Sequence, residues 1–578
     1  MTALSRRAAK FVLAAALLPL PGGTAWAASD PAPELAITIA PAAPDAAHVI
    51  PYIDVTIVAQ DVHRIAGEEL FRLALVANTV VTSAKDLQGL TIADGKGAIT
   101  PQTSDVEKDG SSRTRVWQAS RAIDGPVTVR YRVPIDAAAP PLALPQYEMR
   151  TEKDSFSAAA NAFVLLPADG KARRAHVYWD FTNYGAGGVG VSSFGVGDVA
   201  SSEALSSDRF GSVYYMAGRP GVYRSGEDGF FAAWQGTPPF AMDPLMRWAA
   251  DLHRFYGRFF GYTPPSFGVF GRTNARNPGS GIGLTDSFAF TFNHTSNPSD
   301  LRSLLAHEML HSWVRSLDES MDAAGGLDRS WFGEGLAVHY QRLLPYRAGM
   351  ISADAFLQDL NSTAGRYYTN IKIGVPNAEI PAGFWRDTRI RVLPYDRGSL
   401  YFASVDAQVR AASGGKRSLD DMVRAMLAAR TAGKPMNEAL WRSLLKAELG
   451  DKGVADLDAM LAGGTVVPPS DAFGPEFRRT TKMLRRFELG FDPASLLARP
   501  KIVRGLIAGS NAEKAGLRDG DEILNTFSQD GLQGKQDAYL ALEVKRGAQT
   551  LSVRYQPRGE AVQSFQWERS SVPSPTAK

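Results

Sequence analysis

The hydrophobic pattern of this 578-residue chain changes twice between its ends, and this limits the folds that it can adopt. From about residue 50, apolar side chains alternate with other residues, as in Ile53–Ile57 and Val127–Val133. Such alternation predicts strands with one buried face, in an antiparallel sheet. Turn signals such as Asp109-Gly110 and Asp124-Gly125 separate the runs. We therefore expect a β-sandwich-like domain over residues 29–175.

The middle of the chain, residues 176–470, is predicted to be an α+β and mainly helical region. Its loop at Arg272–Gly283 is long and rich in glycine and asparagine, and long loops within compact domains are commonly functional. Helical periodicity appears in five segments, Met242–Phe260, Leu301–Leu317, Glu334–Leu344, Tyr401–Ala412 and Leu419–Ala429.

The C-terminal part, residues 480–575, closely resembles a PDZ domain. Glu488-Leu489-Gly490-Phe491 is similar to the carboxylate-binding loop of that family, and Ala508–Leu524 to its short helix and following Gly-Asp turn. The resemblance implies that Leu489, Gly490 and Phe491 bind the C-terminal carboxylate of a peptide ligand through backbone N–H groups. Two alternatives stay open: an unrelated α+β domain, and a PDZ fold that only packs against its neighbour.

The N-terminus has the pattern of a targeting segment. Arg6–Lys10 contains three basic residues, Phe11–Leu18 is apolar, and Ala25–Ala27 is a small-residue cleavage site. The apolar run is shorter than the roughly 20 residues that a spanning helix needs. We expect residues 1–28 to be a signal peptide and the mature protein to be periplasmic or secreted, with no integral membrane segment after cleavage.

Composition excludes several kinds of chemistry. The chain has no cysteine, so disulfides, thiolate metal sites and cysteine nucleophiles are ruled out. Its 63 basic and 60 acidic residues give a net charge of +3 without a basic stripe, so nucleic acid is not an expected partner. Any metal ion must be bound by His, Asp or Glu.

The strongest chemical signal is the motif His307-Glu308-Met309-Leu310-His311. Residues four apart lie on one face of a helix, so both imidazoles can reach one ion with Glu308 beside it. Zinc in a catalytic site has three protein ligands and one open position. Glu334 lies 23 residues beyond His311 at the start of a second helical segment, and we favour it as the third ligand over His339. The predicted cofactor is therefore Zn²⁺.

These motifs, His307–Trp313 followed by Trp331-x-x-Glu334-Gly335, resemble the gluzincin metallopeptidases and in particular the glycyl-aminopeptidase-type family. The resemblance implies an N-terminal β domain, a thermolysin-like catalytic domain and a C-terminal PDZ domain. It also implies that Tyr395 donates a hydrogen bond to the developing oxyanion, the alternative being a tyrosine packed in a turn.

The predicted activity is hydrolysis of peptide bonds in peptide or protein substrates. Zinc would lower the pKa of its water to roughly 7, and Glu308 would act as general base. Two alternatives stay open. One is a catalytically weak peptide-binding or quality-control protein that acts through the PDZ domain. The other is a hydrolase of epoxides or small amides.

The substrate-binding strand is predicted at Gly281–Ser287. The resemblance places an amine-binding glutamate where this chain has Thr285, so recognition of a free amine is in doubt. Gly283, Leu284 and Asp286 are the predicted substrate contacts, because glycines let a substrate backbone approach the strand. Downstream, Phe288, Phe290 and Phe292 alternate like a buried strand face. Asp318, Glu319 and Asp328 are candidate partners for the zinc ligands, chosen by proximity in sequence alone.

Overall fold

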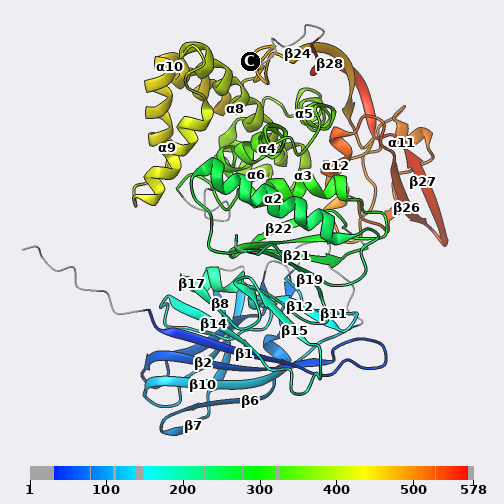
Figure 1. The fold of residues 1–578 in the computed structure, drawn as a ribbon. Coiled ribbons are helices and arrows are strands. Elements are labelled where there is room, and N and C mark those ends of the chain that lie inside the picture. Colours follow the sequence, from blue (N-terminus) through cyan, green and yellow to red (C-terminus); the bar gives the residue numbers. More distant parts are fainter. Residues whose placement is uncertain are drawn as a thin grey trace, which may run out of the picture.

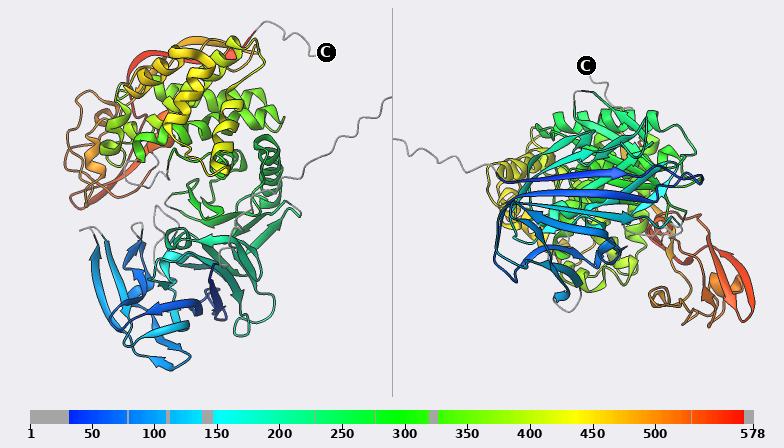
Figure 2. Two further views of the ribbon diagram at one scale, coloured as in Figure 1. Left: turned by 90° about the vertical axis from the view of Figure 1, so that its left-hand side faces the viewer. Right: turned by 90° about the horizontal axis from the view of Figure 1, so that it is seen from below.

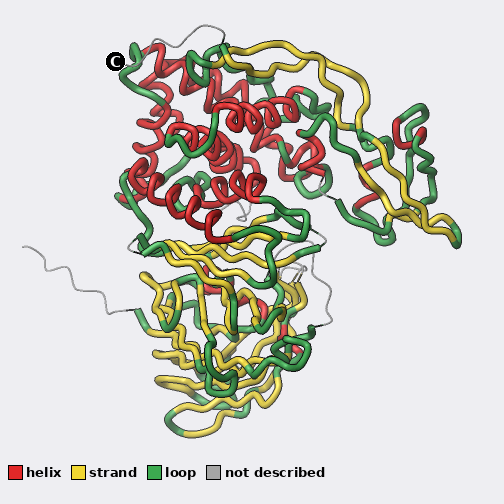
Figure 3. The backbone as a smooth tube through the Cα atoms, turned by 45° about the vertical axis from the view of Figure 1, so that its right-hand side comes forward, coloured by secondary structure: helices red, strands yellow, loops and turns green. Residues whose placement is uncertain are grey.

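The computed structural model describes residues 32–77, 80–108, 112–137, 147–226, 228–275, 277–318, 326–527 and 529–570. The predicted signal peptide, residues 1–28, lies outside the described residues. Three bodies follow one another along the chain: a β body, a central region with a sheet and helices, and a smaller C-terminal body (Figure 1). Figure 3 shows strands at one end of the molecule and helices stacked above them. Among the described residues, no helix is both long and apolar enough to cross a membrane.

The N-terminal β body is built around a seven-stranded sheet in the order β17-β14-β1-β2-β10-β6-β7. Strand β1 pairs with β14 in parallel and with β2 in antiparallel orientation. The sheet consists of β1 (Glu34–Pro41), β2 (Tyr52–Arg64), β6 (Gln88–Asp94), β7 (Gly97–Ile99), β10 (Ile123–Pro134), β14 (Arg173–Trp179) and β17 (Val199–Leu205).

Two smaller sheets complete this body, in the orders β11-β12-β18-β15-β16 and β13-β3-β9-β8. Their strands are β3 (Glu69–Ala74), β8 (Gln102–Lys108), β9 (Ser112–Gln118), β11 (Arg150–Glu152), β12 (Ser155–Ala159), β13 (Leu166–Pro167), β15 (Val189–Ser192), β16 (Gly195–Val196) and β18 (Tyr214–Gly218). The remaining elements here are β4 (Val76–Ala77), β5 (Val80–Val81) and α1 (Ser207–Gly211).

The alternating pattern of the sequence corresponds to these strands. Ile53–Ile57 lies in β2 and Val127–Val133 in β10, and in both the apolar residues are buried while their neighbours are more exposed. The two strands pair in antiparallel orientation, as predicted. Strand β14 runs through residue 175, where the sequence pattern predicts the end of the domain. The β body continues as far as Gly218, because later strands complete its sheets.

The central region contains a five-stranded sheet in the order β19-β20-β21-β23-β22. One face packs on helices through Phe230, Phe267 and Phe288. The opposite face packs on the N-terminal β body through residues such as Phe231 and Phe270. The sheet is formed by β19 (Gly221–Arg224), β20 (Phe230–Trp234), β21 (Phe267–Thr273), β22 (Gly281–Leu284) and β23 (Ser287–Phe292).

The helices of this region confirm the five predicted segments. Helix α2 has both predicted ends, whereas the other four have one or both ends shifted. Helix α3 stops at Leu310, earlier than the predicted Leu317, because the chain turns at His311 and then becomes extended. The helices are α2 (Met242–Phe260), α3 (Pro298–Leu310), α4 (Ser330–Arg347), α5 (Ala353–Tyr368), α6 (Ile380–Gly383), α7 (Thr388–Arg391), α8 (Leu393–Ala412), α9 (Leu419–Thr431) and α10 (Glu438–Leu461).

The C-terminal body projects from the side of the helical region (Figure 2). A two-stranded ribbon of β24 and β28 leads to it and packs against α5, where the Asn361 side chain bonds the backbone N–H and C=O of Trp567 at 2.7 Å each. The body has its own small core. Its elements are β24 (Phe477–Phe487), α11 (Asn511–Lys514), β25 (Glu522–Ile523), α12 (Gln529–Gly534), β26 (Leu540–Arg546), β27 (Gln549–Tyr555) and β28 (Arg558–Arg569). Its PDZ identity stays a prediction.

Candidate active site

Two histidines of the His-Glu-x-x-His motif lie on one face at the end of α3. The helix begins with the Asn297 side chain accepting from the Asp300 N–H, which satisfies one of the free donors of its first turn. Its other face is buried in the central core. His311 is the C-cap residue but keeps helical backbone angles, φ −64° and ψ −12°. His307 and His311 therefore stay one helical turn apart and point the same way.

Glu334, on α4, completes a group of three potential metal ligands. Its Oε2 lies 3.1 Å from His307 Nε2 and 3.6 Å from His311 Nε2, and the two Nε2 atoms are 3.4 Å apart. Among the described residues, these three are the set of His, Asp and Glu side chains whose ligand atoms converge within 4.8 Å. The structure thus brings Glu334 to two histidines that lie 23 and 27 positions before it in the sequence.

Hydrogen bonds determine which ring nitrogens face the shared point. The amide Nε2 of Gln341 donates to Ser303 Oγ at 3.1 Å and to Asp359 Oδ2 at 3.0 Å, so its Oε1 is the acceptor 2.9 Å from His307 Nδ1. His311 Nδ1 faces the carbonyl oxygen of Val314 at 3.2 Å. Both Nδ1 atoms are therefore donors. In a neutral ring this leaves the lone pair on Nε2.

The converging atoms suit a cation. Two Nε2 lone pairs and a carboxylate oxygen repel one another unless a positive charge lies between them, and imidazole and carboxylate are ligands of zinc. Burial by itself would lower the pKa of His311, but the Glu334 carboxylate outweighs it and raises this pKa to about 9. Burial would raise the pKa of Glu334, yet the two imidazoles hold it well below its usual range. The Glu334 carboxylate thus favours positive charge at the point where the three side chains converge.

The support for His307 was missed by sequence reasoning. Gln341 lies seven residues beyond Glu334, two helical turns along α4, whereas the partners predicted from the sequence all precede α4. Behind Gln341, Asp359 of α5 binds the buried guanidinium of Arg342. Burial opposes ionisation of Asp359, but Arg342 outweighs it and lowers the pKa of this carboxyl group. The seven-residue spacing between Glu334 and Gln341, which places both on one face of the helix, is the sequence signal that predicts this contact.

The other candidates from the sequence lie elsewhere. His339 is buried on α4, and within the described part of the chain neither of its ring nitrogens has a hydrogen-bond partner, so it is outside the ligand group. Asp318 pairs with Arg329 at 2.7 Å rather than with a zinc ligand. Asp328 lies 3.8 Å from the same arginine. Glu319 is outside the described residues.

Glu308 lies beside the edge strand β22. A side chain added at Gly281 would come within 3.2 Å of Glu308 Oε1, so the absence of a Cβ there keeps the space next to this carboxylate open. Gly283, two residues along on the same face of β22, has no neighbour within 4 Å of its Cβ position. The two glycines therefore leave a strip of bare backbone on the side of α3, next to the metal ligands.

Tyr395 is brought to the metal ligands by a close helix crossing. Its ring stacks near the His307 ring, with 6.1 Å between centroids and 23° between planes. Helices α4 and α8 meet at Gly335 and Gly398, where a Cβ on Gly335 would lie 2.6 Å from Gly398 Cα. Tyr395 is on the first turn of α8, not in an isolated turn. Burial, and then the charges of Glu334 and Glu308, raise the pKa of Tyr395 well above its usual value, so its hydroxyl stays protonated.

Two of the three predicted substrate contacts face away from this strip. Leu284 packs on the side of the N-terminal β body. Asp286 lies in the turn after β22, with φ +48°, and its carboxylate pairs with Arg209 at 3.2 Å. The Thr285 hydroxyl donates to the Arg209 carbonyl. Gly283 alone of the predicted set faces α3. Phe288, Phe290 and Phe292 are core residues, as expected.

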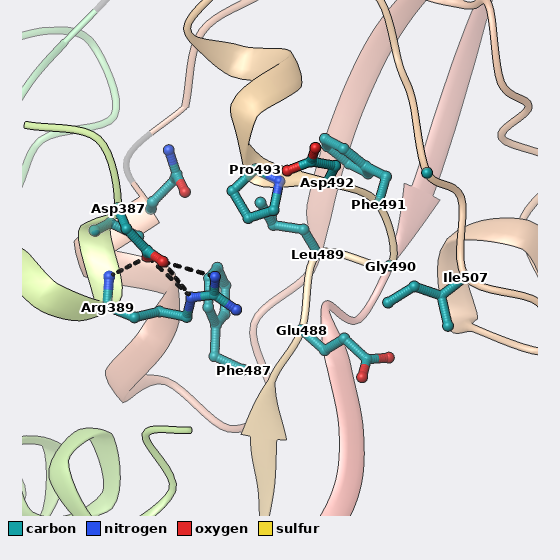
Figure 4. Close-up of a pocket in the computed structure, with 13 residues that line it drawn as sticks. Asp387, Arg389, Phe487, Glu488, Leu489, Gly490, Phe491, Asp492, Pro493 and Ile507 are labelled. Carbon is teal, nitrogen blue, oxygen red and sulfur yellow. Dashed lines mark hydrogen bonds and ion pairs between the residues drawn. The ribbon is translucent and has the colours of Figure 1, made fainter. Parts of the chain in front are cut away.

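The C-terminal loop lies at a second site, a pocket of about 170 Å³. Leu489, Gly490 and Phe491 line it together with Ile507 of the same body. Arg389 and its neighbours from α7 form the facing wall (Figure 4). The sequence motif identified the loop, but it contained no sign of the wall from the central region.

Comparison with known proteins finds a family match over part of the chain and solved structures with a related fold. Residues 300–375, which include both metal-ligand helices, match the family model described as M61 glycyl aminopeptidase. No curated protein matches the chain. An aminopeptidase N family protein from Idiomarina loihiensis has a similar fold, with 14% identity and a TM-score of 0.64, over 92% of this chain and 98% of that chain. An M1 zinc metallopeptidase from Deinococcus radiodurans is 14% identical with a TM-score of 0.44, over 76% of this chain and 95% of that chain.

The class of protein follows from the family match over the ligand helices, the aminopeptidase N-like fold and the converging His-His-Glu group. The chain is a metallopeptidase.

Proposed function

We propose that the protein is an exported, zinc-dependent peptidase with Glu308 as general base. The observation that carries the proposal is the convergence of His307 Nε2, His311 Nε2 and Glu334 Oε2 beside the open strip of β22. Zinc, when bound by these three residues, supplies Lewis acidity toward a scissile carbonyl and lowers the pKa of a water molecule. Export is supported by the signal-like pattern of residues 1–28.

The residues around the ligands have separate tasks. Glu308 takes a proton from the attacking water and passes it to the leaving amine, a transfer typically worth about 10² to 10⁴ in rate. Tyr395 O–H donates to the oxygen on which negative charge develops, and removal of one such donor costs roughly 10² or more. Gly281 and Gly283 let the substrate backbone lie along β22. Gln341 holds His307 in the tautomer that leaves Nε2 free.

The substrate class is further limited by the turn that follows β22. Thr285 stands where a glutamate would bind the substrate's amine, and its hydroxyl is already bonded to Arg209. Asp286 is paired with the same arginine. We therefore infer that cleavage does not depend on a free N-terminal amine, and that the enzyme cuts N-blocked peptides as well as free ones.

The test uses matched peptides with a free or an acetylated N-terminus, incubated with the zinc-loaded protein. We expect both to be cleaved with kcat/KM values within about tenfold of each other, since a tenfold difference is the 1.4 kcal/mol of one modest contact. Glu308→Gln should keep its zinc and lose about 10² to 10⁴ in kcat on both. Normal cleavage by Glu308→Gln would overturn the mechanism, and cleavage of the free peptide alone would overturn the substrate assignment.

A second part of the proposal concerns the C-terminal body. We propose that it is a PDZ domain and that Leu489, Gly490 and Phe491 receive a peptide's C-terminal carboxylate. Support comes from Gly490, whose φ of +82° turns successive backbone N–H groups toward one side. Among the hydrogen bonds between described residues, none has the backbone N–H of Leu489, Gly490 or Phe491 as its donor.

A further inference from the structure

The pocket at the C-terminal loop has walls from two bodies. One wall is the loop Phe487–Pro493 with Ile507, and the other is Asp387, Thr388 and Arg389 of the central region. In Figure 4, Asp387 and Arg389 face the loop from the side of the helical region. At about 170 Å³ the pocket is smaller than the roughly 300 to 1,000 Å³ of a drug-sized site. It therefore suits a single terminal residue.

The lining favours a carboxylate attached to an apolar side chain. The N–H groups of Leu489, Gly490 and Phe491, for which the described residues provide no acceptor, supply donors, while the 45% exposed Ile507 supplies apolar surface. The nearby acidic groups are already engaged: Asp387 binds Arg389 at 2.7 Å, and Asp492 accepts from the Ala494 N–H at 2.9 Å. The Glu488 carboxylate lies against Gly559 of β28, which does not line the pocket.

The wall from the central region is tied to the C-terminal body. Asp530 of α12 pairs with Arg391 at 2.9 Å and accepts a hydrogen bond from Thr388. Gln533, also on α12, donates to the same threonine oxygen at 3.0 Å. These contacts connect α12 directly to α7.

Helix α7 leads directly into the helix that carries Tyr395. It ends at Arg391, α8 begins at Leu393, and the Asp396 N–H donates to the Val392 carbonyl at 3.0 Å. Asp396, next to Tyr395, is buried and is held by Arg366 of α5 at 2.7 Å. The pocket wall is therefore joined through seven residues of continuous backbone to the proposed oxyanion donor.

We infer that the pocket is a composite site, in which a peptide with a free α-carboxylate and an apolar last residue binds against both bodies and is coupled through α7 to the active site. This inference rests on the proposed function of the loop and extends it to the central region. Coupling of this kind is reciprocal. If the bound peptide alters α7, then changes made in α7 also alter the affinity of the pocket for the peptide.

Binding is tested on the full chain carrying Glu308→Gln, so that the probe is not cut. The probe is an N-acetylated hexapeptide ending in valine, and its control is the same peptide with a C-terminal amide. We expect titration calorimetry to show binding of the acid at least tenfold tighter than binding of the amide. Equal affinity of the two, or no binding of the acid at millimolar concentration, overturns the inference. Because no hydrolysis is measured, failure of the proposed peptidase activity gives a separate result.

Three variants locate the site. Ile507→Glu places a negative charge in the pocket and should abolish binding of the acid. Leu524→Glu changes an apolar side chain of the same body that is 49% exposed and outside the pocket, and should leave binding unchanged. Arg389→Ala removes the partner of Asp387. The unpaired Asp387 carboxylate should then weaken binding of the acid peptide several-fold. Full affinity in Arg389→Ala, with loss in Ile507→Glu, would assign the site to the C-terminal body alone and overturn the composite pocket.

Coupling has its own readout. Hydrogen exchange of backbone amides in residues 388–400 should slow when the acid peptide is added and stay unchanged with the amide. Unchanged exchange in this segment at saturating acid would overturn the coupling.

Discussion

The metal centre and the C-terminal pocket are supported in different ways. The three metal ligands lie on α3 and α4 within one core, and each histidine is fixed by an acceptor at Nδ1. The pocket instead lies between two bodies, and the contacts beside it include an exposed ion pair, Asp530–Arg391, whose side chains are 39% and 31% exposed. Exposed pairs contribute about 0 to 1 kcal/mol. The metal ligands are thus held within one core, whereas the pocket depends in part on polar contacts between two bodies.

The sharpest separation of the two sites is expected from Glu334→Ala. Loss of this ligand should abolish zinc binding and hydrolysis, because two imidazoles leave the ion with too few protein ligands. The composite pocket should still bind the acid peptide normally. Zinc content per chain and peptide affinity are measured on the same sample, in the Glu308→Gln background so that the probe is not cut. The control is Glu438→Ala, which changes a partly exposed helical glutamate paired with Arg442. Loss of peptide binding together with zinc would mean that the two sites are not separately supported.

Tyr395→Phe is expected to have the next largest effect. It removes the oxyanion donor but keeps the ring beside His307, so kcat should fall roughly 10²-fold while zinc content stays the same. Since the pKa of Tyr395 is raised well above its usual value, its loss of a proton should cause no decline in rate up to about pH 9. Tyr401→Phe, also buried on α8, is the control and should keep normal kcat. An unchanged kcat in Tyr395→Phe would leave the ring with a packing role only.

Gln341→Leu tests the support of the metal centre. Without the amide acceptor His307 can change tautomer, and zinc affinity should fall about 10- to 100-fold, as for other partners of metal ligands. Competition with a chelator measures this affinity. Gln408→Leu is the matched control, because Gln408 is a partly buried glutamine that donates to Asp456 at 3.1 Å and lies on α8 outside the ligand group. Equal zinc affinities in the two variants would show that Gln341 does not orient His307.

The sequence predicted what depends on local spacing. Alternation identified β2 and β10, helical periodicity identified α2 with both ends correct, and the motif at His307 paired two ligands on one face. Glu334 was chosen because it lay on the next helical segment. These features follow from the two periods of the backbone, 3.6 and 2 residues, and need no knowledge of tertiary contacts.

What the sequence did not predict comes from contacts between distant segments. Asp359 reaches Gln341 from another helix, and Arg389 reaches the loop at Gly490 from another body. The glycines at 335 and 398 matter because two helices cross there. Asp286 was predicted to contact the substrate, but in the fold its carboxylate pairs with Arg209. In each case the partner is more than ten residues away in the sequence, so the helix and strand periods cannot predict the contact.

The smallest effect is expected where the two bodies touch. Asp530→Asn removes the charge that binds Arg391 but leaves the pocket lining intact, so affinity for the acid peptide should change less than about threefold, in line with an exposed ion pair. Zinc affinity should not change. The protection of residues 388–400 from hydrogen exchange on adding the peptide should nevertheless be lost, because the ion pair between α12 and α7 is broken. Asp354→Asn is the matched control: Asp354 also links the central region to the C-terminal ribbon, through Arg569 at 2.9 Å, but far along the chain from α7. Protection that survives in Asp530→Asn would show that the two bodies communicate by another route, such as the packing of β28 on α5.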